Sequence, residues 1–327
     1  MANDTSTGYA SNWNVPNFNG DILLTFSPTD YPLLSRLAGV KVANSHEFAM
    51  SAQYALESFS AAGVPEATSA TAPTAVAYER TNEVNYTQTQ HKAVSVLYDK
   101  LASNNRLKFA EVGSSGYAYS GDPLQSAIAD ELAFQVSRAQ EQLYGDLETA
   151  FMSGTKTQAT SAAVAWATGG IETLVTSNKV NASSAQLSKP LIDNLLRTMF
   201  TNGAKFRRMA FFANAYQRYK LSEIYSFVPP DRSMGGGTVA QIQTDFGLID
   251  VVPSRFATST ILSLVDLSYM YLVKQPVPGK SYMPDGLYFM EELAKTGASE
   301  RYQIFGNNGL DIGAEKLHGQ IYGLATS

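Results

Sequence analysis

Three histidines, His46, His91 and His318, are the side chains of this sequence best suited to metal binding or to acid–base catalysis near neutral pH. They lie far apart in the sequence, so no two of them form a local ligand pair. A zinc-protease helix beginning at His46 would need a second histidine at position 50, where the sequence has Met50. We therefore expect exposed histidines or hydrogen-bonded core histidines, and no metal site.

Glycine-rich motifs also fail to define an active site. The tripeptide Gly279-Lys280-Ser281 could end a phosphate-binding loop, but the glycine required five positions earlier is replaced by Lys274. Residues 245–247 match the metal-binding triplet of protein kinases, yet no histidine here starts the His-Arg-Asp triplet that kinases also need. The sequence therefore predicts no catalytic, cofactor-binding or metal-binding residue, and a hydrolase that uses dispersed carboxylates is left as a minor alternative.

Charge is distributed unevenly along the chain. Residues 197–220 contain six basic side chains and no acidic one. They form a candidate basic patch of Arg197, Lys205, Arg207, Arg208, Arg218 and Lys220. A candidate acidic partner surface consists of Asp130, Glu131, Glu141, Glu291, Glu292 and Glu300. Opposite patches on one chain suit head-to-tail contact between copies, which generates rings, although two ordinary solvated faces would give the same pattern.

The composition favours a protein that assembles. The chain has 327 residues, of which 44% are hydrophobic, 11% aromatic and only 16% charged, whereas roughly 25% of residues are charged in an average soluble domain. A neutral surface rich in aromatic side chains is typical of interface cores. The absence of cysteine excludes disulfides and thiolate chemistry. The net charge of −5 argues against nucleic-acid binding over the whole surface, and no apolar run is long enough to span a membrane.

One helix stands out among the elements that must carry these side chains. Apolar residues recur at steps of three or four from Leu124 to Phe151. Pro123 suits the first helical position, and Gly154 suits the residue after the end. The pattern predicts a helix over residues 122–153, which would be on the order of 45 Å long.

The first hundred residues contain different elements. Residues 1–30 show no sustained period and are predicted to form an extended arm. Asp30 is a candidate cap for a short helix that follows it. Within residues 45–96 apolar side chains alternate on both sides of an alanine-rich middle, which predicts a long two-stranded hairpin with a small-residue tip. Because a lone hairpin is only marginally stable in water, this one should rest on another surface.

The rest of the chain mixes helices and strands. A mobile loop is expected at residues 153–168. Helices are predicted at residues 187–202 and 214–224, and strands at residues 209–213, 238–244, 248–252, 261–266, 269–273, 287–293, 301–305 and 319–324. Residues 245–247 then form a hairpin turn. The fold class is therefore α+β.

Several blocks of sequence resemble a known family. Residues 293–297, 301–304 and 315–324 are similar to the C-terminal signature of the major capsid, or major head, protein family of tailed phages. Residues 244–252 and 79–82 look like further blocks of the same family. The resemblance extends over residues 31–324 and implies the Hong Kong 97-type fold of that family.

That fold implies a particular division of the chain. It consists of an N-terminal arm, an E-loop hairpin, a long spine helix, and peripheral and axial domains. The implied segments are residues 1–44 for the arm and short helix, 45–100 for the E-loop hairpin, 101–186 for the peripheral domain with its spine helix at 122–153, 187–285 mainly for the axial domain, and 286–327 for the C-terminal return strands.

The resemblance also implies a function. The protein would be a major capsid protein, not an enzyme, that self-assembles into pentamers and hexamers of an icosahedral head shell enclosing double-stranded DNA. It would be assembled in the host cytoplasm and found in the virion, without a cofactor or a membrane. Expected partners are other copies of the chain, scaffolding, portal and decoration proteins, and non-specifically bound packaged DNA. The basic patch would face either a neighbouring subunit or that DNA. The shell protein of a cellular nanocompartment is the alternative within this fold.

Overall fold

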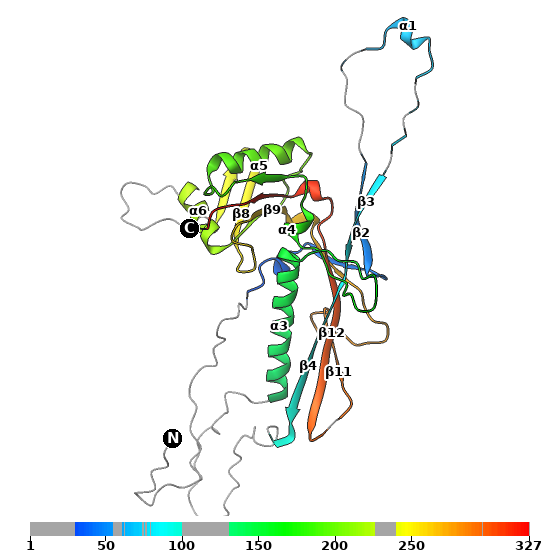
Figure 1. Cartoon of the computed structure of the whole chain (residues 1–327), viewed down its shortest axis with the longest axis vertical. Coiled ribbons are helices and arrows are strands. Elements are labelled where there is room, and N and C mark those ends of the chain that lie inside the picture. Colours follow the sequence, from blue (N-terminus) through cyan, green and yellow to red (C-terminus); the bar gives the residue numbers. More distant parts are fainter. Residues whose placement is uncertain are drawn as a thin grey trace, which may run out of the picture. The chain divides into compact units, whose positions relative to one another are not determined.

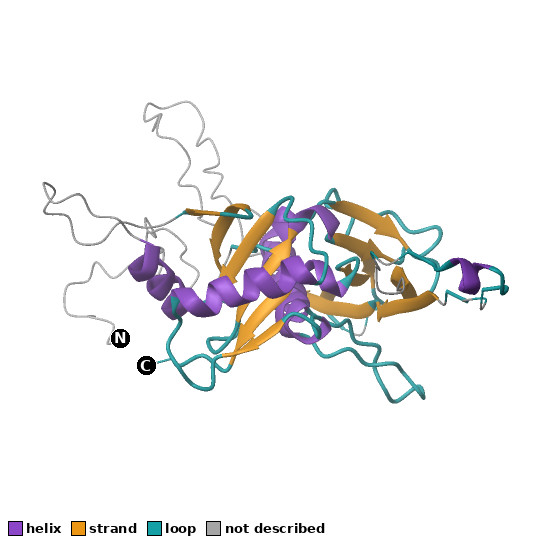
Figure 2. Cartoon of the chain, turned by 90° about the horizontal axis from the view of Figure 1, so that it is seen from above, coloured by secondary structure: helices purple, strands orange, loops and turns teal. Residues whose placement is uncertain are grey.

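The computed structural model describes residues 30–54, 61–99 without positions 62, 74, 76 and 79, 131–225, 240–295 and 297–326. The chain forms two compact units. The described residues of the smaller unit lie within Ala93–Glu141 and Glu291–Gln303, and those of the larger unit within Pro28–Lys92, Gln142–Met290 and Ile304–Ser327. Helices and strands are mixed along the chain, which confirms the predicted α+β class (Figure 2).

A six-stranded sheet forms the centre of one part of the larger unit. Its order is β5-β13-β9-β6-β8-β7. The strands are β5 (Lys179–Asn181), β6 (Met209–Ala213), β7 (Gln241–Thr244), β8 (Gly247–Pro253), β9 (Leu262–Asp266) and β13 (Gly319–Tyr322). Strand β6 runs parallel to β8 and antiparallel to β9. All five of its residues are buried, as its uninterrupted apolar sequence predicts for a strand covered on both faces.

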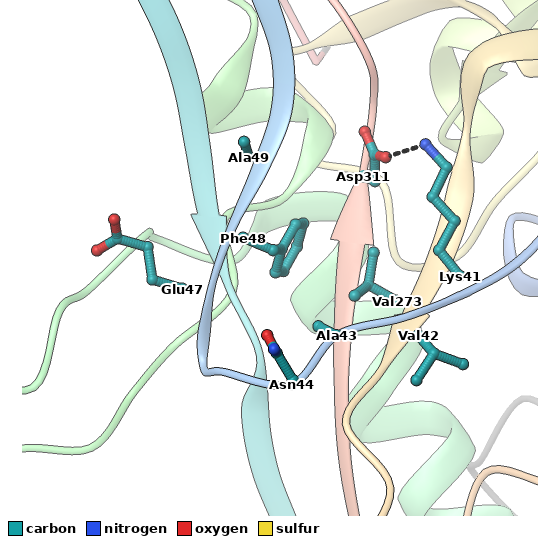
Figure 3. A pocket seen from close by; sticks show the side chains of 9 residues that line it. All are labelled: Lys41, Val42, Ala43, Asn44, Glu47, Phe48, Ala49, Val273 and Asp311. Atoms are coloured by element: carbon teal, nitrogen blue, oxygen red, sulfur yellow. Dashed lines mark hydrogen bonds and ion pairs between the residues drawn. The ribbon is translucent and has the colours of Figure 1, made fainter.

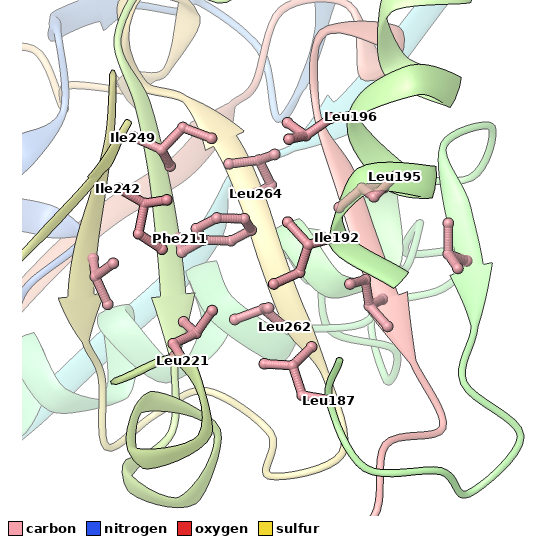
Figure 4. Packing of buried hydrophobic residues seen from close by; sticks show 14 of the residues in the cluster. Leu187, Ile192, Leu195, Leu196, Phe211, Leu221, Ile242, Ile249, Leu262 and Leu264 are labelled. Atoms are coloured by element: carbon pink, nitrogen blue, oxygen red, sulfur yellow. The ribbon is translucent and has the colours of Figure 1, made fainter. Parts of the chain in front are cut away.

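Two hydrophobic cores cover the two faces of this sheet. Successive side chains of a strand point to opposite faces, so Phe211 enters one core and Phe212 the other. The first core lies under helices α5 (Lys189–Thr201) and α6 (Ala215–Tyr225). Figure 4 shows Ile192 and Leu195 of α5 facing Phe211 and Leu264 of the sheet. Full burial of each such side chain contributes roughly 1.5–3 kcal/mol.

The second core contains the end of a long helix. Helix α3 (Glu131–Ser153) ends just before Gly154, as predicted, and the predicted first turns at 122–130 lie outside the described residues. Leu147 and Phe151 of this helix are fully buried in the core. A Cβ on Gly154 would lie 2.3 Å from the carbonyl oxygen of Ala150, so only glycine fits where the helix stops. In the described part of the chain, no helix combines the length and apolar character needed to cross a bilayer.

A second sheet has five strands. Its order is β1-β10-β12-β11, and β4 also pairs with β12. The strands are β1 (Gly39–Val42), β4 (Gln88–Leu97), β10 (Tyr271–Lys274), β11 (Phe289–Glu292) and β12 (Ser299–Asp311). Short helical segments join the strands and sheets at η2 (Leu267–Tyr269), η3 (Glu315–Leu317) and α4 (Ile171–Leu174). The predicted helices and strands after residue 187 are thus confirmed, with β12 longer than expected.

The predicted hairpin is real but shorter than residues 45–100. It consists of β2 (Glu47–Tyr54) and β3 (Arg80–Tyr86), paired antiparallel, with the short helix α1 (Glu66–Ser69) near its tip (Figure 1). Strand β4, which falls in the same stretch, belongs to the five-stranded sheet instead. The alternating pattern was read correctly as strand, but alternation alone does not identify the pairing partner.

The predicted short helix near residue 32 is a single 3-10 turn, η1 (Leu34–Arg36). Asp30 does not cap it, because Leu33 occupies the N-cap position and no side chain of the turn caps its own backbone. The carboxylate of Glu148, in α3, accepts the free N–H groups there instead.

Candidate assembly surfaces

The predicted basic patch is divided between the two ends of strand β6. The entry group lies in the C-terminal half of α5 and in the loop into β6, and consists of Arg197, Lys205, Arg207 and Arg208. The exit group lies in α6, after β6 has ended, and consists of Arg218 and Lys220. A strand of five residues is about 17 Å long. The six residues therefore do not form a single patch.

Three phenylalanines form a cluster beside the entry group. The ring centroid of Phe246, in the turn between β7 and β8, lies 5.3 Å from that of Phe200 and 5.2 Å from that of Phe206. Phe200 is 61% exposed, and Leu248 at the start of β8 is 53% exposed. We call Phe200, Phe246, Leu248 and the entry group the basic–aromatic surface.

The positive charges of the basic–aromatic surface are not neutralised by the described residues. The carboxylate of Asp266 accepts the backbone N–H groups of Arg207 and Arg208, each at 3.1 Å, which fixes the loop but not the two side chains. No carboxylate of the described residues lies within 4.0 Å of a side-chain nitrogen of Lys205, Arg207 or Arg208. Exposed aromatic groups with arginine around them match the composition of interface cores.

The exit group lies beside acidic and tyrosine side chains. The Nζ atom of Lys220 is 2.8 Å from a carboxylate oxygen of Glu223, and Tyr219 is 65% exposed. Tyr225 packs partly buried against the first core, and this burial, together with the Asp193 carboxylate of α5, raises the pKa of its phenol. We call Asp193, Tyr219, Glu223 and Tyr225 the acidic–tyrosine surface. Sequence reasoning missed it, because its members come from two helices and no run of charge marks them.

The predicted acidic partner surface lies in the smaller unit. Its described members are Glu131, Glu141, Glu291, Glu292 and Glu300, whereas Asp130 lies outside the described residues. Three of these carboxylates have partners within the unit. Glu131 accepts a hydrogen bond from Gln135 at 2.7 Å, Glu141 is 2.8 Å from the guanidinium of Arg138, and Glu292 is 3.6 Å from Lys295 Nζ. Two of these carboxylates, Glu141 and Glu292, thus have a positively charged partner, whereas the partner of Glu131 is neutral.

A buried side chain fastens the root of the hairpin to other segments of the larger unit. Asn85 of β3 is fully buried, and its Nδ2 group donates to the carbonyl oxygens of Leu310 at 2.7 Å and Gly169 at 3.2 Å. Its Oδ1 atom accepts the N–H of Gly169 at 2.8 Å. Trp166 lies stacked on His46 and tilted against Tyr86. The loop at 153–168, predicted as mobile, thus supplies a residue that packs against the hairpin root.

A pocket of about 350 Å³ lies beside the hairpin root (Figure 3). It is lined by Lys41, Val42, Ala43, Asn44, Glu47, Phe48, Ala49, Val273 and Asp311. The Lys41 ammonium is 2.5 Å from the buried carboxylate of Asp311. The lining contains no histidine and no hydroxyl or thiol nucleophile, and of its three charged side chains Lys41 and Asp311 are paired with each other.

Each of the three histidines is either hydrogen-bonded within the protein or exposed to solvent. The Nδ1 atom of His46 shares a hydrogen bond of 2.9 Å with the hydroxyl oxygen of Thr87, and His91 is exposed. His318 is buried, with Nδ1 accepting the N–H of Asp266 at 3.1 Å and Nε2 donating to the carbonyl oxygen of Ile312 at 2.6 Å. The described residues contain no group of three potential metal ligands. These environments match the hydrogen-bonded and exposed histidines that the sequence predicts.

The buried imidazole of His318 should make the free energy of unfolding depend on pH. Burial lowers its pKa below the ordinary 6.5, and protonation would remove the acceptor that Asp266 N–H needs. Because the unfolded chain then binds the proton more readily, stability is lost as pH falls below 6.5. We expect a contribution of up to about 1.4 kcal/mol per pH unit from this group.

Urea unfolding of the unassembled chain between pH 7.5 and 5 checks this expectation. The pH slope of His318→Gln should be shallower than that of the wild type, while His91→Gln, at an exposed histidine, should keep the wild-type slope. Equal slopes for all three proteins would contradict the assignment.

Comparison with known protein families identifies the family of this chain. The family model described as SU10 major capsid protein matches residues 4–325, which is nearly the whole chain. The chain belongs to the SU10 major capsid protein family. The predicted role as a major capsid protein, and not an enzyme, is thereby confirmed. No curated protein is significantly similar to it.

Solved structures with the same fold are distant in sequence. The capsid of cyanophage A-1(L) is 12% identical with a TM-score of 0.62, and the match covers 100% of both chains. The capsid of a native GTA particle is 14% identical with a TM-score of 0.58, covering 99% of this chain and 100% of the other. The SrpI encapsulin of Synechococcus elongatus PCC 7942 is 12% identical with a TM-score of 0.56, covering 100% and 97%. These likenesses confirm the predicted Hong Kong 97-like fold of this family member.

Proposed function

We propose that this major capsid protein assembles as pentamers and hexamers into a closed icosahedral shell around double-stranded DNA. The observation that carries the proposal is the family match over residues 4–325. Within such a shell each copy makes several contacts, so that individually weak interfaces add up to a stable assembly. The protein would then be part of the virion.

The elements of the fold suit the parts of such a subunit. We assign α3 to the spine, the β2–β3 hairpin to the E-loop, the six-stranded sheet to the axial domain and the five-stranded sheet to the peripheral domain. The segment boundaries expected from the sequence stay part of this proposal. Assembly in the host cytoplasm, and scaffolding, portal and decoration proteins as partners, are expected on the family resemblance alone.

Electron microscopy of the purified full-length chain tests the main proposal. Shells or rings of five or six copies are expected, with or without an added scaffolding protein. Only monomers and dimers at high protein concentration under both conditions would overturn it. Shells that enclose a protein cargo and exclude nucleic acid would favour the nanocompartment alternative. The SrpI encapsulin, whose fold is similar, is the reason to test for it.

We further propose that the basic–aromatic surface of one copy binds the acidic–tyrosine surface of the next. The carboxylates of Asp193 and Glu223 are complementary in charge to the entry group, although Lys220 already pairs with Glu223 within one copy. Both surfaces expose aromatic side chains, Phe200 on one and Tyr219 on the other. Different patches that meet head to tail generate rings when the rotation closes. The exposed Phe200 and Leu248 favour a protein partner, because neutralising DNA phosphates requires only the cations.

Charge reversal of Arg207 and Arg208 tests this interface. Arg207→Glu with Arg208→Glu should reduce the yield of shells at least tenfold, measured by light scattering and electron microscopy. The backbone N–H bonds to Asp266 do not involve the replaced side chains, so the fold and its circular dichroism should be retained. The matched control, Arg207→Lys with Arg208→Lys, keeps the charge and should assemble.

Compensating changes identify the partner surface. Adding Asp193→Lys and Glu223→Lys to the charge-reversed chain should restore shells. Restoration by Glu292→Lys and Glu300→Lys instead would show that the predicted acidic surface of the smaller unit is the partner. Normal empty shells from the charge-reversed chain would rule out the interface, and loss of DNA packaging alone would show that the basic residues face DNA.

A further inference from the structure

A buried carboxylate holds the segment at residues 30–37 on the spine helix. Glu148 of α3 is fully buried, and its Oε1 atom accepts the backbone N–H of Leu33 at 2.7 Å. Its Oε2 atom accepts the N–H of Leu34 at 2.9 Å. Both oxygens of one side chain thus bind the start of the η1 turn, where backbone N–H groups have no partner within the turn.

Apolar and aromatic contacts surround this pair of hydrogen bonds. Leu33 is fully buried in the second core. The ring of Tyr31 lies 5.6 Å from that of Tyr144, one helical turn before Glu148, and 6.4 Å from that of Phe256, measured between centroids. Docking of the segment therefore takes the carboxylate out of water, and undocking returns it.

No cation makes an ion pair with Glu148 among the described residues. The charged groups that act on it come from the docked segment itself: Asp30 opposes its ionisation and Arg36 favours it. The guanidinium of Arg36 donates to the carbonyl oxygen of Pro32 at 2.9 Å rather than to the carboxylate. Besides Glu148, the rings of Tyr144 in α3 and of Phe256 lie against Tyr31 of the segment, and of these two rings only the Tyr144 phenol can titrate.

Burial raises the pKa of Glu148 to about 7, although its two N–H donors pull the value down. In the undocked segment the carboxylate would return to water and to its ordinary value of 4.5. The docked form therefore binds a proton more tightly than the undocked form. By linkage, docking is most favourable below pH 4.5 and weakens as pH rises through about 7.

We propose that docking of residues 30–37 onto helix α3 is a proton-linked latch in which Glu148 is the titrating group. Uptake of a proton by Glu148 favours the docked segment, and loss of the proton favours its release. Residues 30–37 lead into strand β1, so the latch acts at the start of the part of the chain that the structure describes. The latch operates within one subunit and does not depend on whether shells form.

Amide hydrogen exchange of the full-length chain, followed by mass spectrometry, tests the latch. The readout is the protection factor of peptides covering residues 30–37, after correction for the intrinsic pH dependence of exchange. In the wild type we expect this protection to fall on the order of a hundredfold between pH 5 and pH 8. Peptides covering β6 should keep their protection, since the core does not open.

Two variants separate the latch from other effects. Glu148→Gln retains one acceptor but does not titrate, so protection of residues 30–37 should become independent of pH in this range. Asp146→Asn removes an exposed carboxylate of the same helix and should keep the wild-type fall. Wild-type protection that stays constant or rises with pH, an equal fall in β6, or an unchanged fall in Glu148→Gln would each overturn the proposal.

Discussion

Replacing Asn85 with alanine should lower the free energy of unfolding by about 3–5 kcal/mol. The side chain makes hydrogen bonds to the carbonyl oxygens of Leu310 and Gly169 and to the N–H of Gly169, all in a fully buried site. Alanine would leave these backbone groups without partners in the core. Leaving each buried polar group unsatisfied costs roughly 1–3 kcal/mol.

Urea or thermal unfolding of the unassembled chain measures this effect. Asn82→Ala is the matched control, because Asn82 lies in the same strand but is exposed, and its change should stay within about 0.5 kcal/mol. If both variants unfolded at the same urea concentration, Asn85 would not be the fastening of the hairpin root. If Asn85→Ala lowers the free energy of unfolding while its folded chains still form normal shells, the side chain acts on stability and not on assembly.

Replacing Gly309 with alanine should cost about 2–3 kcal/mol through crowding where the hairpin root meets strand β12. A Cβ at this position would lie 2.8 Å from the carbonyl oxygen of Tyr86 and 3.0 Å from Cε1 of Phe48. The oxygen belongs to the backbone and cannot move aside as a flexible side chain could. The strands of the hairpin and of the sheet would have to separate.

Gly145→Ala provides the contrast. A Cβ on Gly145, in the middle of α3, would meet nothing within 4 Å. Alanine is a better helix former than glycine, so this variant should be more stable than the wild type by about 0.5–1 kcal/mol. Both substitutions add one methyl group, but they should change the free energy of unfolding in opposite directions. A Gly309→Ala variant more stable than the wild type would disprove the close approach at the hairpin root.

Local periodicity made part of this fold predictable from sequence. The stripe of Leu187, Leu191, Leu195 and Met199 has the step of four that places one helix face on the sheet, and α5 follows it. The uninterrupted apolar run of β6 likewise matches a strand buried on both faces. Both signals are contained within a dozen residues, so no distant partner was needed to read them.

Long-range partners explain what sequence reasoning missed. Glu148 caps a turn that lies 115 residues earlier in the chain, and Asn85 reaches a carbonyl group 225 residues later. Neither side chain differs in type from its exposed neighbours, so nothing local marks it as buried. The candidate surfaces could not be predicted for the same reason. Strand β6 separates basic residues that are near one another in the sequence, and the acidic–tyrosine surface takes Asp193 from α5 and Tyr225 from α6.

The position of β13 has a consequence for protein synthesis. This strand is the last of the described strands to leave the ribosome, yet it lies inside the six-stranded sheet, between β5 and β9. Helix α5 packs directly on it, with Gly319 allowing the close approach of Leu195 and Met199. Helix α5 also carries residues of both proposed contact surfaces, Asp193 on one and Phe200 on the other. A nascent chain thus lacks the support of β13 beneath these surfaces until residue 322 has left the ribosome.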